Sequence, residues 1–205
     1  MNSEQFQKLW LCFANEVKNN KDELNSLDSA IGDADHGTNL DRGLQKVVLQ
    51  SATSSLQKDC KTIAMVLLSN VGGASGALWG SALLACSRVL PDSDNCQDST
   101  FIEFLKIFGE TISQRGKSSR GDKTMLDVFI PAFDQISKDV NNGISFNVAV
   151  SNVGKNLESW TEETKPLQAK KGRAAYLGPR SIGHIDPGAR SCAMWWHCLD
   201  RVSNS

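Results

Sequence analysis

The sequence has neither a long hydrophobic run nor an excess of one charge. Its longest apolar stretch, residues 63–68, is far shorter than the roughly 20 residues that cross a bilayer. Lysine and arginine number 22 and aspartate and glutamate 23, which leaves a formal charge of −1. These absences argue against a membrane protein and against non-specific binding to nucleic acid or anionic membranes. The polar, amphipathic N-terminus also lacks the pattern of a signal peptide, so we expect a cytoplasmic protein.

Paired cysteine motifs are missing as well. The six cysteines form no CxxC pair and no Cys/His spacing typical of a zinc site. A chain of 205 residues is long enough to fold around its own core without disulfides, and its length fits a single domain spanning residues 1–205. We therefore expect mostly structural thiols in a reducing compartment.

No alternating β pattern, hairpin turn or internal repeat is present. Apolar residues instead recur at helical spacing, which predicts an all-α fold of about eight helices. The predicted helical segments lie within residues 6–17, 44–48, 63–71, 78–90, 101–112, 125–136, 148–160 and 194–202. Pro131 marks a kink or a helix boundary, and residues 91–100 contain only turn formers and acidic residues, as in a loop.

Glycines gather in four polar interruptions between these helices. The interruptions are residues 31–37, 70–76, 116–122 and 172–188. A simple connection between two helices needs only one glycine, whereas binding residues are often carried on elaborate loops. We therefore expect the four loops to assemble one functional site.

The first loop and its flanks, residues 27–39, carry Asp28, Asp33 and Asp35 with no lysine or arginine between them. Carboxylate oxygens suit hard divalent cations, chiefly Mg²⁺ or Ca²⁺. An EF-hand that began at Asp33 would need glutamate where Leu44 stands, which favours Mg²⁺. Helix capping and turn formation by the same aspartates is the alternative interpretation.

The other three loops have features of phosphate-binding segments. The second loop, with Gly72, Gly73 and Gly76, would bring the backbone of a helix N-terminus close to an anion, although a plain helix break explains the same glycines. The third loop, residues 115–127, resembles the end of a P-loop but has Thr111 where the motif needs glycine. It is therefore interpreted as a capped helix start near phosphates, or else as a solvated basic loop.

The fourth loop is long and without a helical pattern, which is typical of functional or disordered segments. Its aliphatic and aromatic residues argue against disorder. Arg173 and Arg180 are suited to phosphate or ribose oxygens, and Asp186 is suited to ordering an arginine. Together the four loops supply what Mg²⁺-nucleotide binding and phosphoryl transfer require. No Ser/His or Cys/His arrangement identifies a nucleophile, so the catalytic residues are unassigned.

These loops, in this order, resemble the nucleotide-binding L subunit of dihydroxyacetone kinases. The resemblance rests on DSAIGDADHG from Asp28, GGASG from Gly72, GDKTM from Gly121, GRAAYLG from Gly172 and SIGHIDPG from Ser181. It covers residues 27–191. Each motif is weak alone, but the ordered set is specific.

The resemblance implies an eight-helix barrel with a nucleotide, ADP or ATP, bound by the interhelical loops at one end. Two Mg²⁺ would be held by Asp28, Asp33 and Asp35. The residues placed at the nucleotide by this resemblance are His36, Gly37, Thr38, Asn39, Ala74, Ser75, Gly116, Thr124, Met125, Arg173 and Asp186.

The resemblance also implies two protein partners. Dihydroxyacetone would be held by a separate K subunit, and a phosphotransferase-system protein would rephosphorylate the bound ADP. A homodimer is compatible with this assignment. The alternatives are a subunit that exchanges ATP freely and a regulatory binding protein that retains the fold. Four residues depart from the family pattern, and they affect how the loops fit the nucleotide rather than the metal ligands. They are Ala34, Ala77, Trp79 and Pro179.

Overall fold

The computed structural model describes all 205 residues, and it contains helices and no strand. The all-α prediction is confirmed. The elements are α1 (Ser3–Asn19), α2 (Lys21–Ile31), α3 (His36–Val47), α4 (Leu56–Asn70), α5 (Gly73–Cys86), α6 (Asp98–Gly116), α7 (Leu126–Asn141), α8 (Phe146–Gly154), α9 (Leu157–Glu162), the 3-10 helix η1 (Arg173–Ser181) and α10 (Pro187–Ser203). None of them is both long and apolar enough to span a bilayer.

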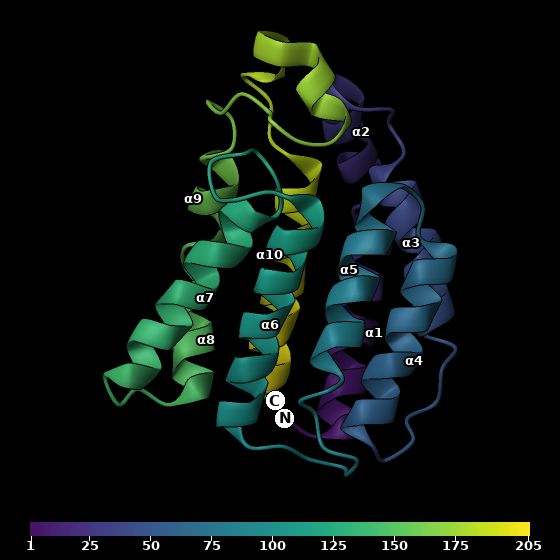
Figure 1. Cartoon of the computed structure of the whole chain (residues 1–205), viewed down its shortest axis with the longest axis vertical. Coiled ribbons are helices and arrows are strands. Elements are labelled where there is room, and N and C mark those ends of the chain that lie inside the picture. The colour runs from purple at the N-terminus through teal and green to yellow at the C-terminus, as the bar shows by residue number, and fades with distance from the viewer.

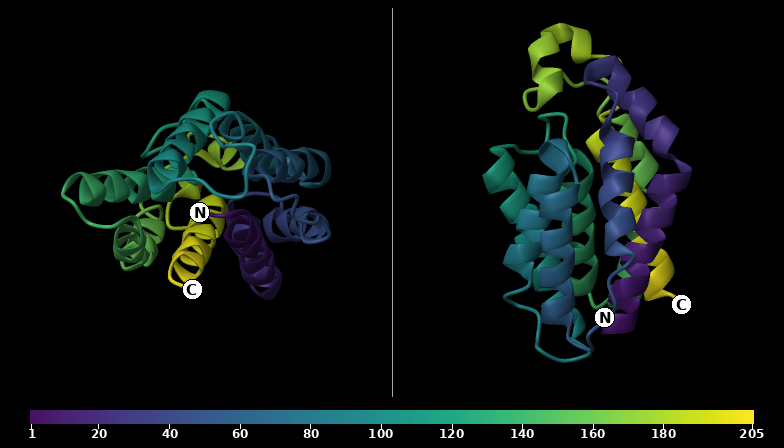
Figure 2. Two further views of the ribbon diagram at one scale, coloured as in Figure 1. Left: turned by 90° about the horizontal axis from the view of Figure 1, so that it is seen from below. Right: turned by 90° about the vertical axis from the view of Figure 1, so that its right-hand side faces the viewer.

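Eight of the ten α-helices close into a barrel. Each packs on the next in the order α1, α3, α4, α5, α6, α7, α8, α10, and α10 returns to α1. Figure 2 shows these helices end on in its left view. Helix α2 and η1 lie together at one end of the barrel, and the two chain termini lie at the opposite end (Figure 1).

Aromatic rings fill the middle of the barrel. The ring of Trp79 on α5 contacts those of Trp10 and Phe13 on α1, Phe108 on α6 and Trp195 on α10, with ring centres 5.3 to 6.1 Å apart. Each such pair contributes about 0.5–1.5 kcal/mol beyond the burial of its apolar surface. Helices that are distant in the sequence are thus fixed to one another, and the barrel becomes a rigid support for the loops at its end.

The helix count and some boundaries differ from the sequence-based prediction. The predicted helix within residues 148–160 is divided into α8 and α9 by a break at Lys155 and Asn156. The long fourth loop, predicted to be without regular structure, contains η1. Pro131 lies inside α7 without ending it, since proline removes only one helical hydrogen bond there.

Candidate functional site

The four glycine-rich loops meet at the α2 end of the barrel, around a cavity of about 650 Å³. All but two of the residues that the resemblance places at the metal or the nucleotide line this cavity, whereas Arg180, also considered for phosphate binding, is exposed on η1 and does not line it. Those that line it are Asp28, Asp33, Asp35, His36, Asn39, Ala74, Ser75, Gly116, Thr124, Met125, Arg173 and Asp186.

The two exceptions, Gly37 and Thr38, lie at the start of α3 and face α2 instead. The backbone N–H of Thr38 donates to Asn25 Oδ1 at 3.0 Å, and Asn25 Nδ2 donates to Thr38 Oγ1 at 2.9 Å. A Cβ on Gly37 would lie 2.3 Å from the carbonyl oxygen of Lys21. These two residues therefore hold α3 against α2 and do not border the cavity.

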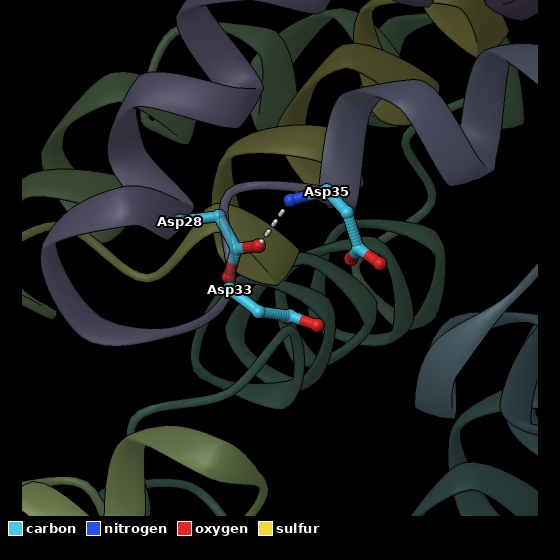
Figure 3. A group of neighbouring side chains, drawn as sticks. All are labelled: Asp28, Asp33 and Asp35. Atoms are coloured by element: carbon cyan, nitrogen blue, oxygen red, sulfur yellow. Dashed lines mark hydrogen bonds between the residues drawn. The ribbon is translucent and has the colours of Figure 1, made fainter.

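The aspartates of the first loop converge, as Figure 3 shows. One carboxylate oxygen from each of Asp28, Asp33 and Asp35 lies within 4.8 Å of the other two. The Asp28 side chain is held in place because its Oδ2 accepts the backbone N–H groups of Asp35 at 2.9 Å and of His36 at 3.2 Å. Asp33 is paired with the guanidinium of Arg173, 3.0 Å away. Three carboxylates this close repel one another in the absence of a cation, so the donor set fits Mg²⁺.

The backbone of the loop brings the aspartates together. A Cβ on Gly32 would lie 2.1 Å from Asp28 Oδ1, so any larger residue there would displace the carboxylate. Ala34 adopts a positive φ of 62°, a conformation that costs a residue with a Cβ about 1–2 kcal/mol. The alanine that departs from the family pattern therefore stands where the chain turns sharply.

Two helix N-termini face the cavity. Helix α3 begins at His36, and α5 begins at Gly73, whose φ of +67° favours glycine. A Cβ on Gly72 would lie 2.6 Å from Asn39 Oδ1, so glycine lets the two segments approach closely. Free N–H groups at the start of α5 make this part of the cavity suited to anionic groups, whereas at the start of α3 the N–H groups of His36 and Thr38 already donate to Asp28 and Asn25.

Part of the lining is apolar. Leu78 of α5, Ile112 of α6 and Met125 at the start of α7 border the cavity, and Gly116 packs beside Leu78. A cavity with convergent polar groups on one side and apolar side chains on another is typical of small-molecule binding sites. The arrangement can accept a ligand with a charged end and a flat apolar end.

Lys123 has a role that the sequence did not reveal. Its side chain is buried, and Nζ donates to the carbonyl oxygens of Thr164 at 2.8 Å, Leu167 at 3.2 Å and His184. Burial lowers the pKa of Lys123, against the opposing effect of nearby Asp186. The lysine thus fastens the third loop to the fourth, whereas its sequence context suggested phosphate binding.

Asp186 is half-buried at the start of α10, where its Oδ2 accepts the backbone N–H of Ala189 at 2.7 Å and caps the helix. Burial raises the pKa of Asp186 to about 7, although the bond from Ala189 acts in the other direction. The expected arginine partner is absent, because Arg173 pairs with Asp33 instead.

His36 links the first loop to α10. Its Nε2 lies 3.0 Å from Ser191 Oγ. Burial lowers the pKa of His36, while the neighbouring Asp28 and Asp35 carboxylates raise it. The His36 ring is therefore positioned from two sides, by its place at the start of α3 and by α10.

Comparison with known proteins places this geometry in a family. The family model described as the DAK2 domain matches residues 30–200. The chain is 39% identical over 191 residues to the ADP-binding subunit of PEP-dependent dihydroxyacetone kinase 1 from Listeria innocua, with 91% of this chain and 90% of that protein covered. It is also 39% identical to the ADP-binding subunit of the PTS-dependent dihydroxyacetone kinase from Lactococcus lactis, with 94% of each chain covered.

A solved structure shows the same fold. The dihydroxyacetone kinase of C. freundii in complex with AMP-PNP and Mg²⁺ superposes with a TM-score of 0.74 at 21% identity. The match covers 95% of this chain but only 33% of that longer kinase. With a family model that spans most of its length and relatives matched along nearly their whole length, this chain belongs to the DAK2-domain family.

Proposed function

We propose that this chain is the ADP-binding subunit of a cytoplasmic dihydroxyacetone kinase, a phosphotransferase. The observation that carries the proposal is the convergence of Asp28, Asp33 and Asp35 at the edge of a cavity that also has two helix N-termini. The relatives support it because two proteins of nearly this length are named as ADP-binding subunits.

The aspartates would hold two Mg²⁺. Asp28 offers Oδ1 because its Oδ2 is already engaged by backbone N–H groups, and Asp33 and Asp35 offer more exposed carboxylates. When bound, Mg²⁺ would neutralise charge on the phosphates of the nucleotide. The pairing of Asp33 with Arg173 shows that this carboxylate attracts positive charge in the protein itself.

The remaining lining residues would orient the nucleotide. Backbone N–H groups at Ala74 and Ser75, at the start of α5, would meet the phosphates, which are the most negative part of the ligand. The adenine ring would lie against the apolar side formed by Leu78, Ile112 and Met125. This orientation directs the terminal phosphate toward the aspartates and the open edge of the site.

The acceptor and the donor would come from partner proteins. We assign dihydroxyacetone to a separate K subunit, which would dock where the terminal phosphate is exposed. A phosphotransferase-system protein would then return a phosphoryl group to ADP, so that the nucleotide stays bound as a coenzyme. The names of the relatives, PEP-dependent and PTS-dependent, support this assignment over a subunit that exchanges ATP.

Native mass spectrometry of freshly purified protein tests the bound coenzyme. We expect a mass excess that equals ADP plus two Mg²⁺ and that disappears after treatment with EDTA. A protein that neither purifies with ADP nor binds it when Mg²⁺ is added would contradict the proposal. An apo protein that binds ATP weakly, and only with Mg²⁺, would support the ATP-exchanging alternative instead.

Reconstitution tests the transfer itself. The chain is mixed with a sugar-binding K subunit and dihydroxyacetone, and the sugar phosphate is measured with either ATP or a phosphorylated phosphotransferase-system protein as the donor. Product formed at catalytic amounts of ADP with the phosphoprotein would confirm the coenzyme role. Tight nucleotide binding without product from either donor would indicate a regulatory binding protein.

A further inference from the structure

Two cysteines face each other across the junction that closes the barrel. Cys12 lies on α1 and Cys198 on α10, the first and last helices of the barrel. Their Sγ atoms are 2.7 Å apart, closer than two sulfur atoms without an interaction normally approach, and both thiols are free. Cys12 is partly exposed, whereas Cys198 is buried behind it. The pair is far along α10 from the cavity and takes no part in the proposed nucleotide site.

The surroundings favour ionisation of Cys12 over Cys198. Cys12 and Cys198 are hydrogen-bonded through their sulfur atoms, and Arg201 Nη1 lies 3.9 Å from Cys12 Sγ. These interactions lower the pKa of Cys12 to about 7, although burial and the neighbouring Glu16 oppose them. The Cys12 sulfur and burial raise the pKa of Cys198. Cys12 is therefore the more readily ionised of the two thiols, and the thiolate is the reactive form of cysteine.

We propose that Cys12 and Cys198 form a redox-active dithiol, in which Cys12 reacts with a low-molecular-weight disulfide and Cys198 completes an intramolecular disulfide. In the first step the Cys12 thiolate attacks one sulfur of the small disulfide and releases its other half as a thiolate. In the second step Cys198 loses its proton, attacks Cys12 Sγ and expels the remaining half. Two protein thiols are oxidised and one small disulfide is reduced to two thiols.

The other four cysteines do not share this environment. Cys60, Cys86 and Cys192 are buried, and burial raises the pKa of each thiol. Cys96 is partly exposed, but burial raises its pKa too, and it makes no hydrogen bond to a second cysteine. Reaction should therefore be selective for Cys12, since it follows thiolate character and access.

The full chain, incubated with oxidised glutathione at neutral pH and mapped by non-reducing peptide mass spectrometry, tests the proposal. We expect the loss of two free thiols and a peptide pair that joins Cys12 to Cys198, reversed by dithiothreitol. The denaturation midpoint should rise on oxidation because the disulfide constrains the unfolded chain. Six unchanged thiols, or a disulfide that involves any other cysteine, would overturn the proposal.

Variants separate the two roles. Cys198→Ser should stop at a glutathione adduct on Cys12, and Cys12→Ser should not react, while Cys96→Ser should behave as the unaltered protein. Arg201→Gln should slow alkylation of Cys12 by iodoacetamide at pH 7 several-fold and move the midpoint of its pH profile upward. An adduct that forms on Cys198 in Cys12→Ser, or an unchanged profile in Arg201→Gln, would refute the assigned roles.

Discussion

Replacing Asp28 and Asp33 one at a time with alanine should distinguish the effect of each aspartate on stability from its effect on metal binding. Asp28 Oδ2 accepts two backbone N–H groups, whereas Asp33 makes one ion pair with an Arg173 side chain that is 70% exposed. Hydrogen bonds to a charged acceptor contribute about 1.5–3 kcal/mol each, and exposed ion pairs about 0–1 kcal/mol. Asp28→Ala should therefore lower the free energy of unfolding by about 3 kcal/mol or more. Asp33→Ala should change it by less than about 1 kcal/mol.

Both variants should lose Mg²⁺-dependent ADP binding, by at least about 100-fold, because each removes a proposed metal ligand. Asp28→Asn is the matched control, since its amide oxygen can still accept the two N–H groups while the charge is gone. It should recover most of the stability of the unaltered protein and still bind Mg²⁺ and ADP poorly.

Urea unfolding in EDTA measures the stability terms, and isothermal titration with ADP in the presence and absence of Mg²⁺ measures binding. In EDTA no cation compensates the repulsion among the aspartates, so Asp33→Ala can even be slightly more stable than the unaltered protein. An Asp33→Ala variant with unchanged ADP affinity in Mg²⁺ would refute the metal assignment. Equal loss of stability in Asp28→Ala and Asp33→Ala would refute the structural role given to Asp28.

Three further predictions follow from the same contacts. Gly32→Ala should weaken Mg²⁺-dependent ADP binding, measured by titration, at least about tenfold, because a Cβ there would displace the Asp28 carboxylate. An affinity equal to that of the unaltered protein would contradict this reasoning. The pKa of Asp186 is raised to about 7 in the folded protein, against about 4 in the unfolded chain. The protonated carboxyl therefore stabilises the fold fully below pH 4, and this stabilisation is lost as the pH rises through 7. Urea unfolding between pH 5 and 8 should show a loss of about 1 kcal/mol per pH unit that is absent in Asp186→Asn. Lys123→Met should leave buried carbonyl groups without a hydrogen-bond donor. The variant should therefore have a free energy of unfolding lower by about 2–4 kcal/mol, and residues 163–186 should become accessible to protease. Unchanged proteolysis would contradict the conclusion that Lys123 holds this segment in place.

The parts of the structure that the sequence predicted are those set by local pattern. Apolar residues at helical spacing located most of the barrel helices, because each barrel helix has one face in the core. Clustered glycines and aspartates located the loops of the site, because a close approach such as that of Gly72 to Asn39 excludes other residue types. Helix α2 was not identified, since Leu24, Asp28 and Ile31 are its only buried residues and leave little apolar pattern.

The parts that the sequence did not predict depend on tertiary partners. Lys123 occupies a basic, glycine-rich loop that resembles a phosphate-binding segment, and only the fold shows three carbonyl groups around its Nζ. Thr38 stands directly after the motif DSAIGDADHG, yet the direction of α3 turns it toward Asn25 and away from the cavity. Motif position therefore identified the loop correctly but not the direction of each side chain.

Helix α10 connects the features that lie far apart in the molecule. Its first turn is capped by Asp186, its next turn contacts His36 through Ser191, and its last turns carry Cys198. A helix of 17 residues is about 25 Å long, so the dithiol and the cavity are separated by well over one turn of a continuous, buried helix. Oxidation at Cys198 would fix α10 to α1 near the chain termini, while the His36 contact holds α10 to α3 near the cavity. The helix is then anchored to a neighbouring helix near each of its ends.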